Sequence, residues 1–343
     1  MSEYILADDG IEFDGRMAED KPLGGAETAT VNLLNALAAR GNTVSAFTHC
    51  KERVSHKGVR WIPLNEGPPA TADLYIANRS WRLIRWMPRA RRTVFWIHNP
   101  AGYLLKPRYL RRLFAVRPPI VFSGESHRRS YPFWAPGKRV IVPYGIDDLF
   151  RTAVPREGTP PPRAIFTSNP MRGLDWLLEL WALRIRPAVP NAELHVFSGA
   201  SVYGGDANPK SRAMNQIIAR AKKLASAGVV LHDPLPKAQL LNEILASRVM
   251  LYRGDEGETF CLAVGEAQAA GLPAVVQPIA AVKERVIDNV TGRIAPDDAA
   301  FAEAAVKILT DEALYRRYHK GALENQRNWS WDDAAFQFEL LLP

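Results

Sequence analysis

Short apolar segments alternate with amphipathic helical segments along the chain, and this alternation limits the possible folds more than any other feature. Early in the chain, Tyr4–Ala7, Val44–Thr48 and Leu74–Ala77 are apolar segments of strand length. Between the first two, apolar residues recur every three or four positions from Val31 to Ala38, which is the period of a helix that buries one face. Strands that alternate with helices predict an α/β fold with a parallel sheet covered on both faces.

A second series of the same kind begins after a proline-rich stretch that peaks at residues 159–162. The length of 343 residues also exceeds what one hydrophobic core usually serves. We therefore predict two Rossmann-like βα domains, residues 1–147 and 163–328, joined by a Pro-rich linker over residues 148–162 and followed by a C-terminal segment, residues 329–343. Because open α/β sheets bind ligands at the carboxyl ends of their strands, the two domains are expected to face each other across a cleft.

The composition excludes several classes of protein. Apolar residues make up 47% of the chain and charged residues 23%, which is ordinary for a globular protein. There is no apolar run long enough to span a bilayer, and the first residues lack the basic leader and apolar stretch of a secretory signal. Cys50 and Cys261 have no partner at metal-ligand spacing, so we expect two free thiols in a reducing, cytoplasmic location.

Positive charge is concentrated in one segment. Between Arg79 and Arg139 the chain carries 15 Lys and Arg residues and one acidic residue, Glu125, whereas the whole chain carries 44 and 36. Such asymmetry points to an anionic partner. The segment's arginines recur at helical spacing with tryptophans between them, which suits an anionic membrane face, an anionic acceptor or a solvated arginine-rich surface. The candidate residues of this face are Trp81, Arg82, Arg85, Trp86, Arg89, Arg108, Arg111 and Arg112.

The most specific motif lies in the second half of the chain. Glu258 and Glu266 stand eight residues apart, which predicts two carboxylates on one face of a helix, two turns apart. Carboxylates accept hydrogen bonds from sugar hydroxyls, and the start of such a helix offers free N–H groups to a diphosphate. The spacing alone fits an amphipathic helix with two surface glutamates equally well.

The residues that follow this pair resemble the retaining glycosyltransferases of the GT-B fold, particularly family 4. Their C-terminal domain carries two Glu separated by seven residues, then Ala, small residues, Gly, Pro and a valine-rich strand. The matching residues here are Glu258, Glu266, Ala267, Ala269, Ala270, Gly271, Pro273, Val275 and Val276. The resemblance implies that Glu258 contacts hydroxyls of the transferred sugar and that Glu266 holds the nucleotide ribose. Thr259 stands where the family often has Gly.

The resemblance also assigns roles to other loops. The glycine pair Gly24-Gly25 resembles the loop that approaches the donor phosphate, and His98 occupies a strand end where the family has a His that touches the donor sugar. Arg172 would be the main diphosphate anchor, because the family's preceding Arg is missing. Arg253, at a strand end near Glu258, is expected to supply a second positive charge or to be a solvated surface group. The remaining donor-binding candidates are Leu235, Thr259, Phe260 and Cys261.

The resemblance implies a retaining transferase that moves a hexose-type sugar from a nucleotide-diphosphate sugar to a glycan, lipid-linked or other anionic acceptor. Its catalytic candidates are His98, Arg172 and Glu258, with no cofactor and no metal, since an Asp-x-Asp motif is not evident. The first domain would bind the acceptor, residues 329–343 would form a helix that crosses back to it, and peripheral contact with the inner face of a membrane would be compatible. No nucleic-acid partner is expected. The alternatives are a protein that binds nucleic acid or an anionic surface, and a non-catalytic, epimerase or phosphorylase relative. The oligomeric state is open.

Overall fold

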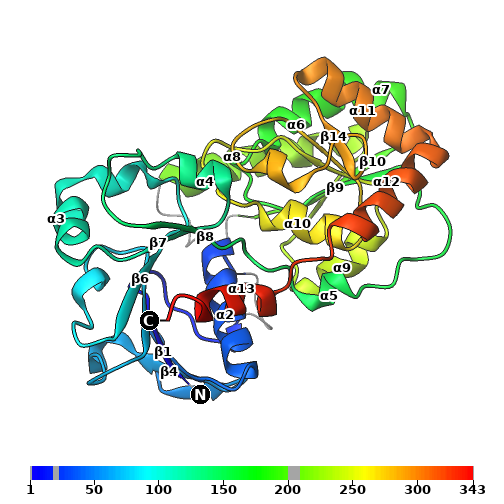
Figure 1. The fold of residues 1–343 in the computed structure, drawn as a ribbon. Coiled ribbons are helices and arrows are strands. Elements are labelled where there is room, and N and C mark those ends of the chain that lie inside the picture. Colours follow the sequence, from blue (N-terminus) through cyan, green and yellow to red (C-terminus); the bar gives the residue numbers. More distant parts are fainter. Residues whose placement is uncertain (1, 18–22, 200–208, 343) are drawn as a thin grey trace. The chain divides into compact units, whose positions relative to one another are not determined.

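The computed structural model describes residues 2–17, 23–199 and 209–342, and the chain divides into two compact units (Figure 1). The first unit is Met1–Gly145 with Trp329–Pro343, and the second is Ile146–Asn328. Both units combine a largely parallel sheet with helices, which confirms the predicted α/β class with two Rossmann-like sheets. Within the described ranges, no helix is long and apolar enough to cross a bilayer.

The first unit contains an eight-stranded sheet in the order β3-β4-β2-β1-β5-β6-β7-β8. All neighbouring strands are parallel except the antiparallel pair β3 and β4. The strands are β1 (Glu3–Ala7), β2 (Thr43–Thr48), β3 (Val54–His56), β4 (Val59–Pro63), β5 (Leu74–Asn78), β6 (Arg92–Trp96), β7 (Ile120–Phe122) and β8 (Arg139–Ile141). Its described α-helices are α2 (Gly25–Ala39), α3 (Pro107–Val116), α4 (Glu125–Arg129) and α13 (Trp331–Glu339). The strand order reverses between β1 and β5, so the loops after these strands lie side by side.

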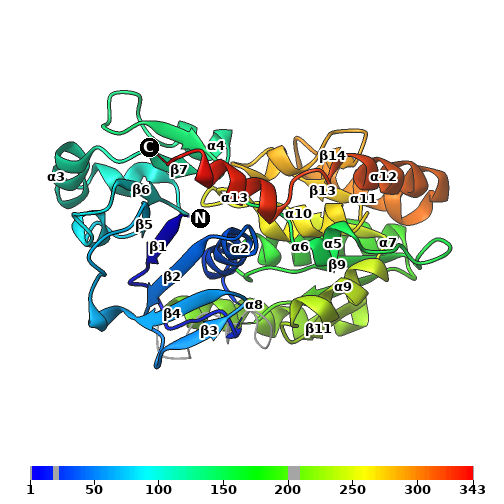
Figure 2. The same cartoon turned by 60° about the horizontal axis from the view of Figure 1, so that its bottom comes forward.

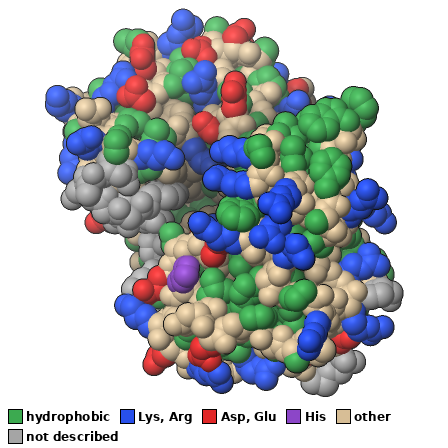
Figure 3. Space-filling model, turned by 90° about the vertical axis from the view of Figure 1, so that its left-hand side faces the viewer, with side chains coloured by type: hydrophobic (Ala, Val, Ile, Leu, Met, Phe, Trp, Pro, Cys, Tyr) green, Lys and Arg blue, Asp and Glu red, His purple; other side chains and the backbone are tan. Residues whose placement is uncertain are grey.

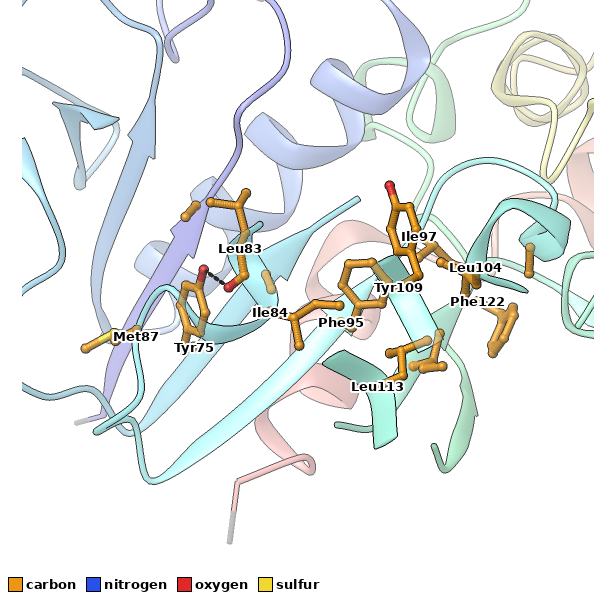
Figure 4. Packing of buried hydrophobic residues seen from close by; sticks show 14 of the residues in the cluster. Tyr75, Leu83, Ile84, Met87, Phe95, Ile97, Leu104, Tyr109, Leu113 and Phe122 are labelled. Atoms are coloured by element: carbon orange, nitrogen blue, oxygen red, sulfur yellow. Dashed lines mark hydrogen bonds between the residues drawn. The ribbon is translucent and has the colours of Figure 1, made fainter. Parts of the chain in front are cut away.

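One hydrophobic cluster of the first unit fills the space between the sheet and α3. Figure 4 shows Tyr75 and Phe95 of the sheet pointing toward residues of the following turns and of α3, among them Leu113. The Tyr75 hydroxyl donates a hydrogen bond of 2.8 Å to the carbonyl of Leu83, so this buried polar group is satisfied. The cluster fixes the segments that carry the basic residues relative to the sheet.

The basic residues between 82 and 89 do not form the predicted helix. Only one 3₁₀ turn, Leu83–Arg85, is present there. Pro88 has no backbone N–H and disfavours the helical conformation at Met87, so a helix cannot continue through this point. Met87 and Ile84 are buried instead, which makes the segment an irregular layer over the sheet rather than a charged helix face.

The C-terminal helix α13 belongs to the first unit. Arg40, which ends α2, forms ion pairs of 2.8 Å with Asp332 and 2.9 Å with Glu339. Ser330 caps α13 together with Asp333, in a reciprocal capping box. Figure 2 shows α13 beside α2, and these contacts explain why residues distant in sequence pack together.

The second unit contains a six-stranded parallel sheet in the order β11-β10-β9-β12-β13-β14. The strands are β9 (Arg163–Phe166), β10 (Glu193–Phe197), β11 (Val229–His232), β12 (Val249–Tyr252), β13 (Ala274–Val276) and β14 (Gly292–Ile294). The described α-helices are α5 (Asp148–Arg151), α6 (Leu174–Leu180), α7 (Arg186–Ala188), α8 (Pro209–Lys223), α9 (Lys237–Leu245), α10 (Leu262–Ala269), α11 (Asp298–Thr310) and α12 (Glu312–Asn325). This is the doubly wound Rossmann order, and its switch point lies between β9 and β12.

The segment predicted as a linker, residues 148–162, lies within the second unit. Asp147 caps α5 by accepting a hydrogen bond of 2.9 Å from the N–H of Leu149, and Phe150 is fully buried. A buried aromatic side chain anchors a segment to its core, so the prolines alone do not make this stretch a free linker. The boundary between the units falls at Gly145 and Ile146 instead.

Gly145 offers a direct test of the packing of the C-terminal segment. An added Cβ at Gly145 would lie 2.2 Å from the backbone nitrogen of Trp331, so that Gly145→Ala must displace backbone. We expect Gly145→Ala to lower the free energy of unfolding by about 1–3 kcal/mol, measured by thermal and urea denaturation. The control is Gly102→Ala, whose Cβ would meet nothing within 4 Å. Equal losses in the two variants would contradict this packing.

Candidate functional site

Two loops at the switch point of the second sheet bring predicted site residues together. One loop follows β9 and carries Arg172, and the other follows the neighbouring strand β12 and carries Glu258. Their side chains form an ion pair with 2.5 Å between Arg172 Nη1 and Glu258 Oε1. The Glu258 residue is 9% exposed, whereas the Arg172 side chain is 34% exposed. A nearly buried carboxylate is thus paired with a cation that still reaches solvent.

Tyr252 fixes the carboxylate of Glu258 from the other side. Its hydroxyl donates a short hydrogen bond to Glu258 Oε1, and its ring stacks on Phe166 with 5.7 Å between centroids. Burial raises the pKa of Tyr252 well above its ordinary value, so that the hydroxyl keeps its proton and remains a donor. The Ser168 hydroxyl lies 3.3 Å from the Tyr252 oxygen. Glu258 therefore has one defined position at the end of β12.

Glu258 and Glu266 do not share a helix, contrary to the prediction. Helix α10 begins only at Leu262, and Glu258 lies in the preceding loop. Asp255 shapes that loop, since its carbonyl accepts from the N–H of Glu258 at 2.9 Å. Cys261 has a φ of 69°, a left-handed conformation that no α-helix interior contains. The chain therefore turns sharply before α10 and places free N–H groups of the helix start close to the turn that follows Glu258.

Glu266 lies on α10 and is held by a residue that the sequence pattern did not single out. Lys237, the first residue of α9, places its ammonium nitrogen 2.7 Å and 2.5 Å from the two carboxylate oxygens. Burial raises the pKa of Glu266, Lys237 lowers it, and Asp147 raises it slightly further, with a net upward shift. Lys237 also lies over the ring of Phe150, 5.7 Å from its centroid. The carboxylate that was predicted to hold the ribose is thus already engaged by an ammonium group from α9.

Arg253 lies beside the Arg172 loop, although its partners differ from those of Arg172. Its Nε donates to Gln277 at 3.1 Å, and its guanidinium lies over Trp176 at 5.2 Å. Arg253 lines a hollow of about 440 Å³ together with Gly173 and other residues of the two loops. Gly173 has a φ of 83°, and a Cβ there would lie 3.0 Å from Arg253 Cβ. Arg253 forms no ion pair within the described part of the second unit, so its charge remains available.

The other donor-binding candidates of the second unit are mostly packed. Thr259, Phe260 and Cys261 are buried, and Arg285 lies over the Phe260 ring at 4.1 Å. Burial raises the pKa of the Cys261 thiol well above its ordinary value, so the thiol stays protonated. Leu235 is half-buried in the loop between β11 and α9. These residues offer backbone groups rather than reactive side chains.

The predicted glycine loop of the first unit adjoins a buried charge network. Gly24 precedes α2, which starts at Gly25, and a Cβ at Gly24 would lie 2.4 Å from a carboxylate oxygen of Glu27. Glu27 pairs with Arg79 at 2.8 Å, and Arg79 pairs with Asp8 at 2.8 Å. The loop needs glycine at this position because the Glu27 side chain occupies the space a Cβ would take.

His98 lies two residues after the end of β6, and both of its ring nitrogens have partners. Its Nε2 lies 2.7 Å from Asn78 Oδ1, and its Nδ1 lies 2.5 Å from the Tyr144 hydroxyl. Asn78 Nδ2 donates to Asp8, so Asn78 Oδ1 accepts, which makes His98 Nε2 the protonated nitrogen. Burial holds the pKa of His98 well below its ordinary value. Both ring nitrogens are therefore used internally, and direct contact with a donor sugar requires a rearrangement that the sequence did not indicate.

The predicted basic face is only partly exposed. Figure 3 shows Lys and Arg side chains gathered on the face it draws. Trp81 is half-buried beside Arg82 and Arg112, at 5.4 Å and 5.8 Å. Trp86 packs against Phe47 at 5.2 Å, so it belongs to the core and cannot insert into a membrane without unpacking. The exposed arginines of the predicted set are Arg82, Arg85, Arg89, Arg108 and Arg111.

Within the described ranges, no group of three or more His, Cys, Asp and Glu side chains is arranged to hold a metal ion. The sequence pattern also did not single out Tyr252, although it is the last residue of a buried strand directly before Arg253. A polar residue that ends a buried strand at a switch point is the signal that would have found it.

The chain is similar to several known proteins. Residues 161–311 match the family model of glycosyl transferases group 1. The D-inositol 3-phosphate glycosyltransferase of Xylanimonas cellulosilytica is 27% identical over 205 residues, which cover 57% of this chain and 48% of that protein. The chain spans about half the length, or less, of the curated relatives it matches.

Solved structures resemble the chain over its whole length. Sucrose-phosphate synthase from Thermosynechococcus elongatus has a TM-score of 0.77 at 17% identity, covering 99% of this chain and 98% of that chain. The E. coli trehalose-6-phosphate structure bound with UDP-2-fluoro glucose has a TM-score of 0.72 at 13% identity, covering 99% of both chains. The chain therefore has the GT-B fold, and residues 161–311 of its second unit are similar to the glycosyl transferases group 1.

Proposed function

We propose that this chain is a retaining glycosyltransferase that moves a hexose-type sugar from a nucleotide-diphosphate sugar to an anionic acceptor. The observation that carries the proposal is the Arg172–Glu258 ion pair at the switch point of the second sheet. It joins a cation for phosphate to a carboxylate for sugar hydroxyls, in a domain that matches glycosyl transferases group 1. One structural relative holds a UDP-sugar analogue, which supports a nucleotide sugar as the donor.

Arg172 is the proposed anchor of the donor diphosphate. Its Nη1 faces Glu258, whereas its Nε and Nη2 donate to no group among the described residues, and the side chain is 34% exposed. A guanidinium with unused donors binds phosphate oxygens through charge-assisted hydrogen bonds. Arg253 supplies a second cation, and the N–H groups at the start of α10 add donors. The proposal assigns the stabilisation of phosphate charge to these groups and not to a divalent metal.

The reaction then requires little further chemistry from the protein. The bond between the sugar C1 and the diphosphate oxygen breaks, and the acceptor oxygen bonds to C1 on the same face. The proton of the acceptor passes to the departing phosphate, which makes a carboxylate base unnecessary. Negative charge that builds on the phosphate is stabilised by Arg172 in place, without reorganisation. Glu258, held by Tyr252, accepts hydrogen bonds from the hydroxyls of the transferred sugar.

Removing the Arg172 charge tests this assignment. We expect Arg172→Ala to lower turnover about 10²–10³-fold, because one oriented donor to the developing charge is lost. Turnover is measured as nucleoside diphosphate released from a panel of UDP-, GDP- and ADP-sugars. The control is Arg184→Ala, an exposed arginine of the same unit without an ion pair among the described residues. Transfer by Arg172→Ala at the rate of the unaltered protein would remove the proposed role.

The Lys237–Glu266 pair makes a pH-dependent prediction. Without Lys237 the main influence that lowers the pKa of Glu266 is gone, so its pKa rises further. At a pH above this pKa, folding must either bury an unpaired carboxylate or protonate it, and both cost free energy. We therefore expect Lys237→Met to lower the melting temperature more at pH 8 than at pH 5. The control is Lys222→Met, an exposed lysine of α8. A loss that is the same at both pH values would contradict the pairing.

Peripheral contact of this cytoplasmic protein with an anionic membrane is a second part of the proposal, and exposed aromatic side chains favour it. In the loop between α4 and β8, Phe133 is 89% exposed and Trp134 is 58% exposed, beside the exposed Lys138. Large exposed aromatic residues flanked by cations suit the interface of an anionic bilayer. Unlike Trp86, this loop can insert without unpacking the core.

Vesicle binding tests the membrane contact. We expect Phe133→Ser/Trp134→Ser to reduce co-sedimentation with phosphatidylglycerol vesicles at least fivefold, because the apolar area that enters the interface is lost. The matched control is Leu183→Ser, a residue of the second unit that is 70% exposed. Equal binding by the double variant and the control, or equal binding to neutral phosphatidylcholine vesicles, would refute the membrane contact.

A further inference from the structure

A hollow of about 390 Å³ lies on the first unit, separate from the Arg172 site. It forms where three neighbouring strands end: Asp9 follows β1, Ser80 and Arg82 follow β5, and Asn99 follows β6. The strand order of this sheet reverses between β1 and β5, which is the place where open α/β sheets bind small ligands. We name this hollow the switch-point pocket. Its size lies in the range of pockets for single small molecules.

Two arginines of the pocket have no carboxylate partner among the described residues. Arg79 also lines the pocket, but its two ion pairs with Asp8 and Glu27 neutralise its charge. Arg82 and Arg108 line the pocket and form no ion pair within residues 2–17, 23–199 and 209–342. Two unpaired guanidinium groups at one small pocket favour a dianionic group, which a planar guanidinium binds through two parallel hydrogen bonds.

The remaining lining supplies hydroxyl partners and apolar faces. Asp9 accepts a hydrogen bond of 2.7 Å from Ser80, which orients its carboxylate and leaves further lone pairs for hydroxyl donors. Asn99 is exposed at the end of β6 and offers an amide. Trp81 lies beside Arg82 at 5.4 Å, and Tyr103 packs edge-on against Tyr109 at 5.1 Å. Aromatic faces next to a carboxylate and an amide suit a polyhydroxylated ring, while the arginines suit its phosphate.

We propose that the switch-point pocket binds a phosphorylated monosaccharide or cyclitol as the acceptor, with Arg82 and Arg108 on the phosphate and Asp9 and Asn99 on ring hydroxyls. This inference rests on the proposed glycosyltransferase function and names the acceptor class. The same chemistry is present in a free sugar phosphate and in a phosphorylated lipid headgroup. A nucleic acid or a flat bilayer surface does not need a hollow of this size that combines a carboxylate with aromatic faces.

Binding measurements test the pocket. Isothermal titration calorimetry is run with glucose 6-phosphate, fructose 6-phosphate and myo-inositol 1-phosphate, with their unphosphorylated forms and with inorganic phosphate. We expect at least one sugar or cyclitol phosphate to bind ten times more tightly than its unphosphorylated form and than inorganic phosphate. Arg82→Gln/Arg108→Gln should weaken that binding at least tenfold. Lys106→Gln/Arg117→Gln removes the same charge from exposed positions that do not line the pocket, and should change it less than twofold.

Two further arms identify the source and separate this inference from the proposed function. Vesicles that contain phosphatidylinositol are titrated beside the free headgroup, and tighter binding of the vesicles assigns the ligand to a lipid. Nucleoside diphosphate binding is measured by thermal shift, where Arg82→Gln/Arg108→Gln should retain it and Arg172→Ala should lose it. If the unaltered protein binds a sugar phosphate but no nucleoside diphosphate, the donor assignment is refuted and the pocket assignment is unaffected. Equal binding of phosphorylated and unphosphorylated rings, tightest binding of inorganic phosphate, or equal losses in both double variants overturns the pocket.

Discussion

The candidate site of the second unit depends on the ion pair between Arg172 and Glu258, whose carboxylate is fixed by the hydroxyl of Tyr252. A carboxylate that is nearly buried needs a charged or hydrogen-bonding partner, and here it has both. The same guanidinium that stabilises Glu258 through Nη1 can turn its other N–H donors toward a diphosphate, because a third of the side chain still reaches solvent. The strand order of the second sheet makes the pair possible, since it places the loops after β9 and β12 next to each other.

The first unit also contains buried carboxylates, and a different arginine neutralises them. Arg79 lies between the carboxylates of Asp8 and Glu27, which neutralise its charge, so it is not available to pair with a ligand. His98 is neutral and uses both ring nitrogens within the same buried network. The arginines outside the network, Arg82 and Arg108 among them, are therefore the groups through which we propose that this unit binds an anion. The buried polar groups define the loop positions, and the exposed arginines around them carry the electrostatic attraction.

Much of the fold follows from the sequence, because buried parallel strands are short apolar runs and the helices between them have a clear period. The strands around Tyr4–Ala7 and Val44–Thr48 were predicted nearly to the residue. The short strands β3 and β14 were not, since three residues give no periodic signal. The interpretation of Glu258 failed because helical spacing does not reveal the left-handed turn at Cys261. His98 and Lys237 show the same limit: their partners come from distant segments that only the tertiary structure brings together.

A crystal structure with a bound nucleoside diphosphate tests the central claim most directly. We predict density for the diphosphate within hydrogen-bond distance of the Arg172 guanidinium, next to the start of α10, with the ribose close to Glu266. Density for the nucleotide at a position remote from residues 172, 258 and 266, or a site that stays empty at saturating nucleotide, would contradict it.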